Sequence, residues 1–414
     1  MKIRSDQPKF GLRSGLVMPG MALAATVALL LSGCSAGGSS SGGSSGSKEP
    51  IKIGATAPLS GALSPGCLKT IGGARGWIDK VNAEGGINGR QIEFTVLDDE
   101  GDPQRGVSNA RRLIGDGVAA FVDNCASPGT VAAIPVIDAA GIPNLFPNSA
   151  SDAIVHPGAP TLFTLLPPFD QQLATVVPYA MGKNGPGKVA LVYIDGLSPN
   201  IAPAAEWAVK KSDGTMVAEL GVPGATTDWG PTVIKLKEAN PDYVAIAHAT
   251  PATGYLVAEM DRQGLKPPKG IIAAYQGADT IYSKNAGAAA TGTITTFATV
   301  MNTDPKAKEC NETLPTDVEQ GGFTVLGCAF MKAALEILKK ADASDKGLSS
   351  ESILEVVKGF DGAGLPELPG VGNEGGGRQL ANAMWMLKVL PDGTLALDSD
   401  KPVEIPDDSN WGVK

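Results

Sequence analysis

Two short apolar runs, at residues 118–122 and 142–146, each stop at a loop of small polar residues. The first loop reads DNCASPG over residues 123–129, and a helix expected over Thr130–Ala140 leads from it to the second run. If the runs are neighbouring parallel strands, both loops lie at the carboxyl ends of the strands, where open α/β folds bind ligands. Free N–H groups at a helix start near Pro128, together with Ser127, would hold an anion there.

The sequence contains no arrangement of residues that supports catalysis. Residues 182–188 imitate a phosphate-binding loop, but Val189 stands where Ser or Thr must bind magnesium, and the segment precedes its strand. There is no GxGxxG segment that opens a helix and no GxSxG elbow, and neither His156 nor His248 has a nucleophile in its own loop. An enzyme is therefore not expected, and no cofactor is implied.

The cysteines favour disulfides over a metal site. Four of the five lie beyond Cys34, which follows the leader described below. None of the four has CxxC spacing, and two histidines leave little material for a zinc centre. An even number of cysteines in an oxidising compartment predicts two disulfides. These four are Cys67, Cys125, Cys310 and Cys328.

The first 33 residues have the pattern of a secretory signal. Four basic residues precede the apolar run Ala22–Leu31, which is short for a membrane span and ends at Ser32 and Gly33 before Cys34. This motif resembles a bacterial lipobox, which implies cleavage before Cys34 and a diacylglycerol on its thiol. Residues 34–50, rich in Ser and Gly, are expected to tether the protein to the outer face of the cell membrane.

The formal charge excludes a nucleic-acid partner. Removal of residues 1–33 takes away four basic side chains and one acidic side chain, which moves the net charge from −9 to −12. A chain this acidic carries no basic stripe of the kind that phosphate backbones require.

The remaining chain alternates between expected strands and helices. Strands are expected near residues 51–55, 91–98, 118–122 and 142–146, and helices near 68–84, 103–115 and 130–140. After an expected crossover between domains at 163–168, the alternation of helices and strands begins again. Helices are expected near 171–183, 201–211, 229–238 and 253–263, and strands near 188–194, 216–220, 243–247 and 271–274. Two further helices, near 321–341 and 350–358, and a strand near 385–390 follow. Repeated β-α-β units imply parallel sheets in two α/β domains.

Four segments carry a resemblance to a known family. These are IKIGATAPLS at 51–60, VNAEGGINGRQIEFTVLDD at 81–99, residues 102–113 and Gly141-Ile142-Pro143. They resemble the leucine/isoleucine/valine-binding type of periplasmic binding protein, the solute receptors of ABC importers. The likeness is strongest over about 51–150, continues in register to about 280, and rests on helix order beyond that point.

The resemblance implies a fold and a function. The fold would be two Rossmann-like lobes with parallel sheets joined by three crossovers, with residues 51–168 and 298–362 in lobe 1 and residues 169–297 and 363–414 in lobe 2. The function would be capture of a small solute, by a monomer, for delivery to a membrane permease and its ATPase. The alternative is a sensory ectodomain of the same fold, which is disfavoured because no apolar segment follows Lys414.

The resemblance also places the ligand site. The family's serine falls at Ser127, where it would hold a carboxylate, and its next contacts fall at Asn148, Ser149 and Ala150. From the other lobe, its contacts fall at Ala249 and Thr250, with Tyr275 beside them, and its amine-binding acid falls near Gln276. Alternative roles remain for several of these residues: Ser127 as a helix cap, Tyr275 as a buried wall residue, and the nearby His248 as a satisfied loop histidine.

Two departures from the family pattern bear on the ligand. Gln276 offers only a dipole where the family has an acid, so it cannot neutralise an ammonium. The family's Asp-x-x-Tyr-Gly loop appears as DGLSP at 195–199, so an aromatic wall is expected to be missing there. We therefore expect a small carboxylate or neutral solute in place of an ordinary amino acid.

Three further expectations concern structure. In this fold the start of the first helix, at Cys67, and the strand end at Cys125 meet at one sheet edge, so these cysteines are paired, which leaves Cys310 for Cys328. The carboxylates at 98 and 99 are expected to be structural loop groups. Trp77 is expected in the core.

Overall fold

The computed structural model describes residues 49–372 and 377–412. The predicted signal segment and the lipidation site at Cys34 lie outside these residues, as does nearly all of the Ser/Gly tether. Within the described part of the chain, no helix is both long and apolar enough to cross a bilayer, and no cluster of side chains is suited to hold a metal ion.

The first sheet has five parallel strands in the order β2-β1-β3-β4-β5. Its strands are β1 (Ile51–Ala57), β2 (Ile92–Asp98), β3 (Ala120–Val122), β4 (Asn144–Leu145) and β5 (Leu162–Phe163). The helices between them are α1 (Ser64–Ala83), α2 (Pro103–Gly115) and α3 (Ser127–Ala139), and the turn η1 (Asp152–Ile154) follows β4. Local chemistry explains α2, because the Asp102 side chain accepts hydrogen bonds from the N–H groups of Gln104 and Arg105 and proline occupies the first turn.

The second sheet is larger and mixed, in the order β12-β11-β10-β9-β8-β6-β7. Its parallel strands are β6 (Lys188–Ile194), β7 (Thr215–Val222), β8 (Tyr243–Ala247), β9 (Gly270–Ala273) and β10 (Ile294–Phe297). Its antiparallel strands are β11 (Ala383–Val389), β12 (Leu395–Leu397) and β13 (Val403–Glu404). Its helices are α4 (Phe169–Asn184), α5 (Ile201–Lys211), α6 (Gly230–Ala239), α7 (Ala252–Arg262) and α8 (Thr280–Ala286), with the short turns η2 (Tyr275–Ala278), η3 (Gly287–Ala290) and η5 (Asp408–Trp411).

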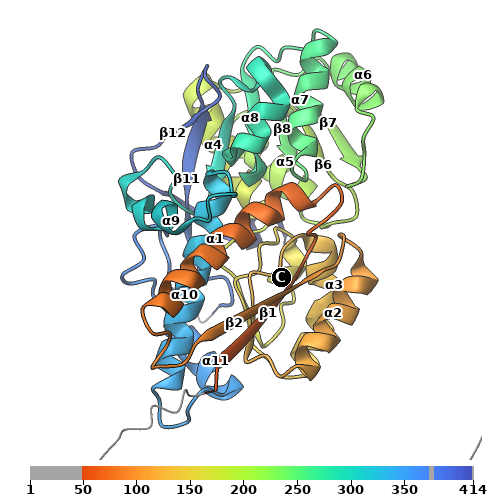
Figure 1. Ribbon diagram of the computed structural model, residues 1–414. Helices are drawn as coiled ribbons and strands as arrows, with labels where there is room; N and C mark the ends of the chain where they lie inside the picture. The colour runs from red at the N-terminus through yellow and green to blue at the C-terminus, as the bar shows by residue number, and fades with distance from the viewer. Residues whose placement is uncertain (1–48, 373–376, 413–414) are drawn as a thin grey trace, which may run out of the picture. The chain divides into compact units, whose positions relative to one another are not determined.

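The late helices return to the first sheet. After β10 come η4 (Pro305–Ala307), α9 (Lys308–Thr313), α10 (Gly322–Asp342) and α11 (Ser350–Lys358). Helix α10 runs beside α1 (Figure 1), and glycines allow the close contact, because a Cβ on Gly327 would lie 1.9 Å from the carbonyl oxygen of Thr70. We use "first lobe" for the elements that pack with the first sheet, including α10 and α11, and "second lobe" for those that pack with the second sheet.

Connections between the lobes also contact one another. The segment after β5 pairs with a segment before β11 through a bridge between Thr164 and Gln379. The N–H of Val300, after β10, donates to the carbonyl oxygen of Glu367 at 2.9 Å. The predicted lobe boundaries, at 168/169, 297/298 and 362/363, stay a prediction.

The predicted α/β fold class with two lobes is confirmed, with three differences in detail. Helix α1 begins at Ser64, four residues earlier than expected, because Pro65 suits a first helical turn. Strands β5, β10, β12 and β13 and helices α8 and α9 were not expected, since each is too short to show a clear period. The second sheet is mixed, because β11 to β13 run antiparallel at its edge.

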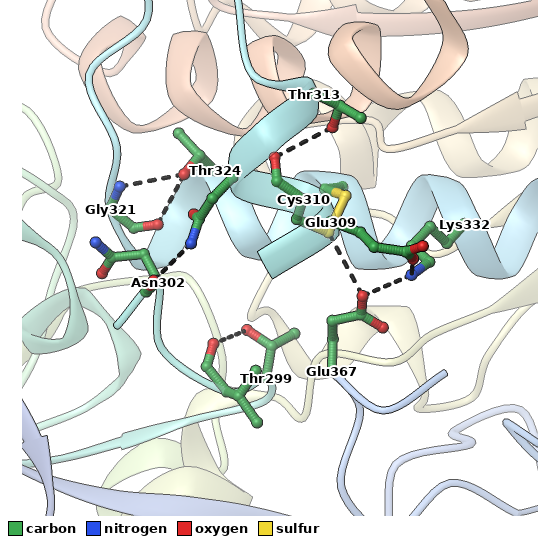
Figure 2. Close-up of a disulfide and its surroundings, with 12 residues drawn as sticks. Thr299, Asn302, Glu309, Cys310, Thr313, Gly321, Thr324, Lys332 and Glu367 are labelled. Atoms are coloured by element: carbon green, nitrogen blue, oxygen red, sulfur yellow. Dashed lines mark hydrogen bonds and ion pairs between the residues drawn. A yellow bond between two sulfur atoms is a disulfide. The ribbon is translucent and has the colours of Figure 1, made fainter. Parts of the chain in front are cut away.

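Both expected disulfides are present. Cys67 is bonded to Cys125 with 5.8 Å between their Cα atoms, and Cys310 to Cys328 with 5.7 Å. Figure 2 shows the second bridge, which joins α9 to α10. Beside it the Lys332 ammonium lies 2.6 Å from Glu367 and 3.0 Å from Glu309.

Candidate functional site

The described residues line an open cavity of about 670 Å³ at the carboxyl ends of strands from both sheets. The first lobe contributes the starts of α1 and α10 and the loops after β2, β3 and β4. The second lobe contributes the start of α4 and the loops after β6, β7, β8 and β9. The parallel strands of both sheets therefore aim their carboxyl ends at one space, as expected for a ligand site in open α/β folds.

Ser127 lies at the wall formed by the first lobe, as its place after β3 predicts. It is the first residue of α3, and Ala126 takes the N-cap position without any side-chain cap, so the alternative role of Ser127 as a cap is wrong. Ala126 has φ +66°, in the left-handed region, and its N–H donates to the carbonyl oxygen of Asn148 at 3.1 Å. The turn therefore aims the uncapped N–H groups of a thirteen-residue helix at the cavity.

The loop after β4 meets this turn. Asn148 and Ala150 line the cavity, whereas Ser149 lies behind Ser127 and donates a hydrogen bond of 2.9 Å to its hydroxyl oxygen. The Asn148 amide donates to Cys125 Sγ at 3.5 Å, and its Oδ1 is buried with no hydrogen-bond partner among the described residues. Of the three residues expected after β4, Asn148 and Ala150 reach the cavity, and Ser149 supports Ser127.

The second lobe brings its predicted residues to the same space. Ala249, Thr250, Tyr275 and Gln276 all line the cavity. The N–H of Tyr275 donates to Gln172 Oε1 at 2.9 Å, which fixes the turn after β9. Thr250 Oγ1 and Gln276 Oε1 are buried and have no hydrogen-bond partner within the described part of the chain. Unpaired buried polar atoms are costly, so both atoms are ready to bind a polar ligand group.

Aromatic rings from other segments form part of the wall. The loop at 195–199 contributes Asp195, Gly196 and Leu197 and no ring, as its sequence implies. Instead, Tyr275 lies between Phe169 and Phe323, with ring centroids 6.0 and 5.7 Å apart. Sequence reasoning missed both phenylalanines, because each begins a helix whose other apolar residues indicate core.

The cavity has no basic side chain among its lining residues. Its two charged residues are Glu100 and Asp195, both exposed to solvent, and Glu100 forms an ion pair with Arg105. An anionic ligand group would therefore be held by hydroxyls, side-chain amides and backbone N–H groups, as at other helix N-termini.

Other residues that the sequence singled out have structural roles. His248 is fully buried; its Nδ1 accepts from the N–H of Ala249 at 2.9 Å, and burial lowers its pKa to about 4. Its Nε2 is buried with no hydrogen-bond partner among the described residues, so the alternative role as a satisfied loop histidine is met at only one of its two ring nitrogens. Asp98 accepts from the N–H of Leu59, and Asp99 accepts from the Thr56 hydroxyl, both at 2.9 Å, as expected for loop carboxylates.

Trp77 is only half-buried, so its expected place in the core is wrong. Its ring lies between the ammonium groups of Lys80 and Lys332, at 4.7 and 4.5 Å from the ring centroid. An amphipathic ring can pack against the core while it contacts cations at the surface.

Solved structures share this architecture. A fatty acid ABC transporter substrate-binding protein from Thermomonospora curvata superposes with a TM-score of 0.78 at 18% identity, over 88% of this chain and 95% of that chain. A solute-binding protein from Rhodopseudomonas palustris, in complex with 3,4-dihydroxybenzoic acid, gives 0.76 at 21% identity, over 87% and 98%. Structural similarity at such low sequence identity shows a shared fold and does not by itself show a shared ligand.

Sequence comparison shows the family. Leu/Ile/Val-binding protein homolog 1 from Brucella melitensis is 27% identical over 340 residues, which cover 77% of this chain and 88% of the relative. The Leu/Ile/Val-binding protein of Escherichia coli K12 is 25% identical over 253 residues, which cover 60% and 67%. These relatives are binding proteins and not enzymes. The profile of the periplasmic binding protein family matches residues 50–394, and the chain belongs to that family.

Proposed function

We propose that this protein is the substrate-binding lipoprotein of an ABC importer, which captures a small solute between two closing lobes and delivers it to a membrane permease. The observation that carries the proposal is the cavity to which both lobes contribute ligand-competent groups. Ser127 and the start of α3 stand on one side, and Thr250 and Gln276 stand on the other. A ligand that contacts both sides stabilises the closed arrangement of the lobes by its differential contacts.

The ligand that best fits the cavity is a small carboxylate or amide with an apolar body. A carboxylate matches Ser127 and the N–H groups of α3, and the apolar body matches the rings of Phe169, Tyr275 and Phe323. Gln276 is 4% exposed and neutral, so an ammonium beside it would lose its hydration without gaining a counter-charge. The carboxylates of Glu100 and Asp195 are exposed, and water screens them.

Solved structures of the same fold contain carboxylate ligands with and without an amino group. Binding proteins from Streptococcus pneumoniae and Thermus thermophilus hold isoleucine and valine. Two from Rhodopseudomonas palustris are in complex with 3,4-dihydroxybenzoic acid and 4-hydroxybenzoate. The fold therefore accommodates carboxylates with and without an amino group, and Gln276 favours the second kind here.

Calorimetry on ligand-stripped protein tests this proposal. Leucine, isoleucine and valine are compared with their keto acids and with short fatty acids. We expect an uncompensated ammonium to weaken binding about a hundredfold, so leucine should bind more weakly than its keto acid. Micromolar binding of the three amino acids, without binding of the deaminated compounds, would show that the proposed ligand class is wrong.

Membrane anchoring has its own test. Cys34→Ala removes the thiol that the lipid would modify, so the full-length variant should leave the membrane fraction and lose labelling by a radioactive fatty acid. The double variant Cys67→Ala/Cys125→Ala is the control, since it removes cysteines elsewhere and should stay with membranes. If Cys34→Ala still sediments with membranes and carries label, the anchor lies elsewhere.

A further inference from the structure

One buried ion pair joins the two lobes beside the cavity. Lys69, on α1 of the first lobe, places its ammonium 2.8 Å from Oδ1 of Asp279, which follows β9 in the second lobe. The two side chains are 9% and 0% exposed. The ammonium also donates to the Thr280 hydroxyl at 2.7 Å. Water screens such a pair little, so it holds its geometry more firmly than a surface pair would.

The Asp279 carboxylate organises the second lobe's side of the cavity. Its Oδ1 accepts from the N–H of Ile281 and caps α8, and its Oδ2 accepts from the N–H of Phe323 at the start of α10, both at 3.0 Å. Tyr275 and Gln276 lie in the turn that ends just before Asp279. One carboxylate thus fixes the segment with Tyr275 and Gln276 against the ring of Phe323.

Lys69 is also linked, through the Cys67–Cys125 disulfide, to the side of the cavity that holds Ser127. Lys69 follows Cys67 by two residues in the first turns of α1. Cys67 is bonded to Cys125, two residues before Ser127, and both cysteines line the cavity. Covalent and ionic links therefore run from the turn at Ser127, through α1, to Asp279.

The surroundings of the ion pair leave it little freedom. Gly321 adjoins it so closely that a Cβ at this position would lie 2.4 Å from Asp279 Oδ2 and 2.9 Å from Lys69 Nζ. The φ of Gly321 is −178°, which any residue adopts, so glycine is needed here for space and not for backbone strain. Any side chain at 321 would wedge the pair apart.

We propose that Lys69 is a positioning residue, whose ion pair with Asp279 sets the position of the Tyr275–Gln276 wall relative to Ser127. The effect of the ion pair on ligand affinity rests on the proposed function. The effect of the pair on the position of the wall does not depend on any ligand. Loss of the pair should loosen residues 275–283 locally, in addition to any general loss of stability.

The chain offers a matched control. Lys332 on α10 pairs with Glu367 at 2.6 Å, and the two side chains are 7% and 0% exposed (Figure 2). This pair has the chemistry and burial of the Lys69 pair, but its position differs. Asp279 directly follows the turn that holds Tyr275 and Gln276, whereas Lys332 contacts Glu309, Glu367 and the ring of Trp77. Lys332→Met and Lys69→Met should therefore both lower the Tm, while only Lys69→Met changes the wall.

Hydrogen–deuterium exchange on the ligand-free protein is the main experiment. In Lys69→Met, the amides of residues 275–283 should exchange about tenfold faster than in the wild type, and in Lys332→Met they should not change. Equal exchange of this segment in the wild type and Lys69→Met, or equal acceleration in both variants, would overturn the proposal.

A second variant perturbs the pair and keeps both charges. Gly321→Ala should accelerate exchange over the same residues, and Gly182→Ala, at a position where a Cβ meets nothing within 4 Å, should not. If Lys69→Met fails to fold, Gly321→Ala decides, and unchanged exchange in that variant rejects the role of the pair.

Calorimetry then links the wall to binding. With the keto acid of leucine as probe, Lys69→Met should weaken binding at least about tenfold, and Lys332→Met less than about threefold. Equal affinities in Lys69→Met and the wild type would reject the role in binding. If the wild type binds none of the probes, the proposed ligand class fails, and the exchange result still decides on Lys69.

Discussion

The hydroxyl of Ser149 donates a hydrogen bond of 2.9 Å to the hydroxyl oxygen of Ser127. A serine hydroxyl has one proton, so this contact leaves the proton of Ser127 free to donate into the cavity. The free N–H groups at the start of α3 point to the same place. Ser149, which does not line the cavity, thereby orients the residue that does.

The first prediction follows from this relationship. Ser127→Ala should weaken the ligand by about ten- to hundredfold, as expected for one hydrogen bond to a charged group. Ser149→Ala should weaken it less, because the Ser127 hydroxyl is then free to rotate but still present. Calorimetry with each variant measures both effects. An unchanged affinity in Ser127→Ala would place the carboxylate elsewhere.

The second prediction concerns Gln276, which the resemblance places near the family's amine-binding acid. Gln276→Glu should shift preference towards amino acids, because a buried carboxylate near an ammonium provides the missing counter-charge. The affinity ratio of leucine to its keto acid should rise at least about tenfold, measured by competition at neutral pH. Gln276→Met is the control, since it removes the polar oxygen without adding charge. A ratio that is the same in both variants would contradict the role of Gln276.

Much of this site follows from the sequence for a simple reason. Ser127, Asn148, Ala249, Thr250 and Gln276 each follow a strand closely, and the carboxyl ends of parallel strands meet at one edge of the sheet. The resemblance to the family names these residues, and the alternation of strands and helices explains why they meet. The pairing of Cys67 with Cys125 follows the same rule, since Cys67 lies in the first turn of α1 and Cys125 in the loop after β3, whereas Cys310 and Cys328 are paired as the two cysteines that remain.

The remaining parts of the site could not be predicted from local sequence. Phe323 reaches the cavity from a helix that begins in the first lobe, and nothing in its apolar surroundings distinguishes it from core. Lys69 and Asp279 are 210 residues apart, and a lysine on an amphipathic helix normally indicates an exposed face. Contacts between lobes depend on how the lobes meet, which periodicity does not encode.

A third prediction compares the disulfides. The loops that they close span 58 and 18 residues, so chain entropy predicts about 4 kcal/mol for Cys67–Cys125 and about 3 kcal/mol for Cys310–Cys328. Urea unfolding of the two double-alanine variants measures the free energy of unfolding in each case. A larger loss for the Cys310–Cys328 pair would show that packing around the bridge outweighs the entropy of the loop.

The last prediction uses a buried acid away from the cavity. Asp170 accepts from Trp411 Nε1 at 3.1 Å, yet burial raises its pKa from 3.8 to about 6. The folded state thus binds a proton more tightly than the unfolded state, so the stability that this group contributes is complete below pH 3.8 and is lost as the pH rises through 6. Asp170→Asn cannot titrate. Its free energy of unfolding, relative to the wild type, should rise by about 2 to 3 kcal/mol between pH 4 and pH 7.

The comparison with the wild type is what makes this measurement diagnostic. Burial lowers the pKa of His248 to about 4, so its contribution to stability increases with pH over much of the same window and opposes that of Asp170. Because His248 is present in both proteins, its contribution cancels in the difference between the two urea-unfolding series. A difference that stays constant from pH 4 to pH 7 would mean that the Asp170 carboxyl is ionised throughout, with Trp411 and its neighbours offsetting the cost of burial.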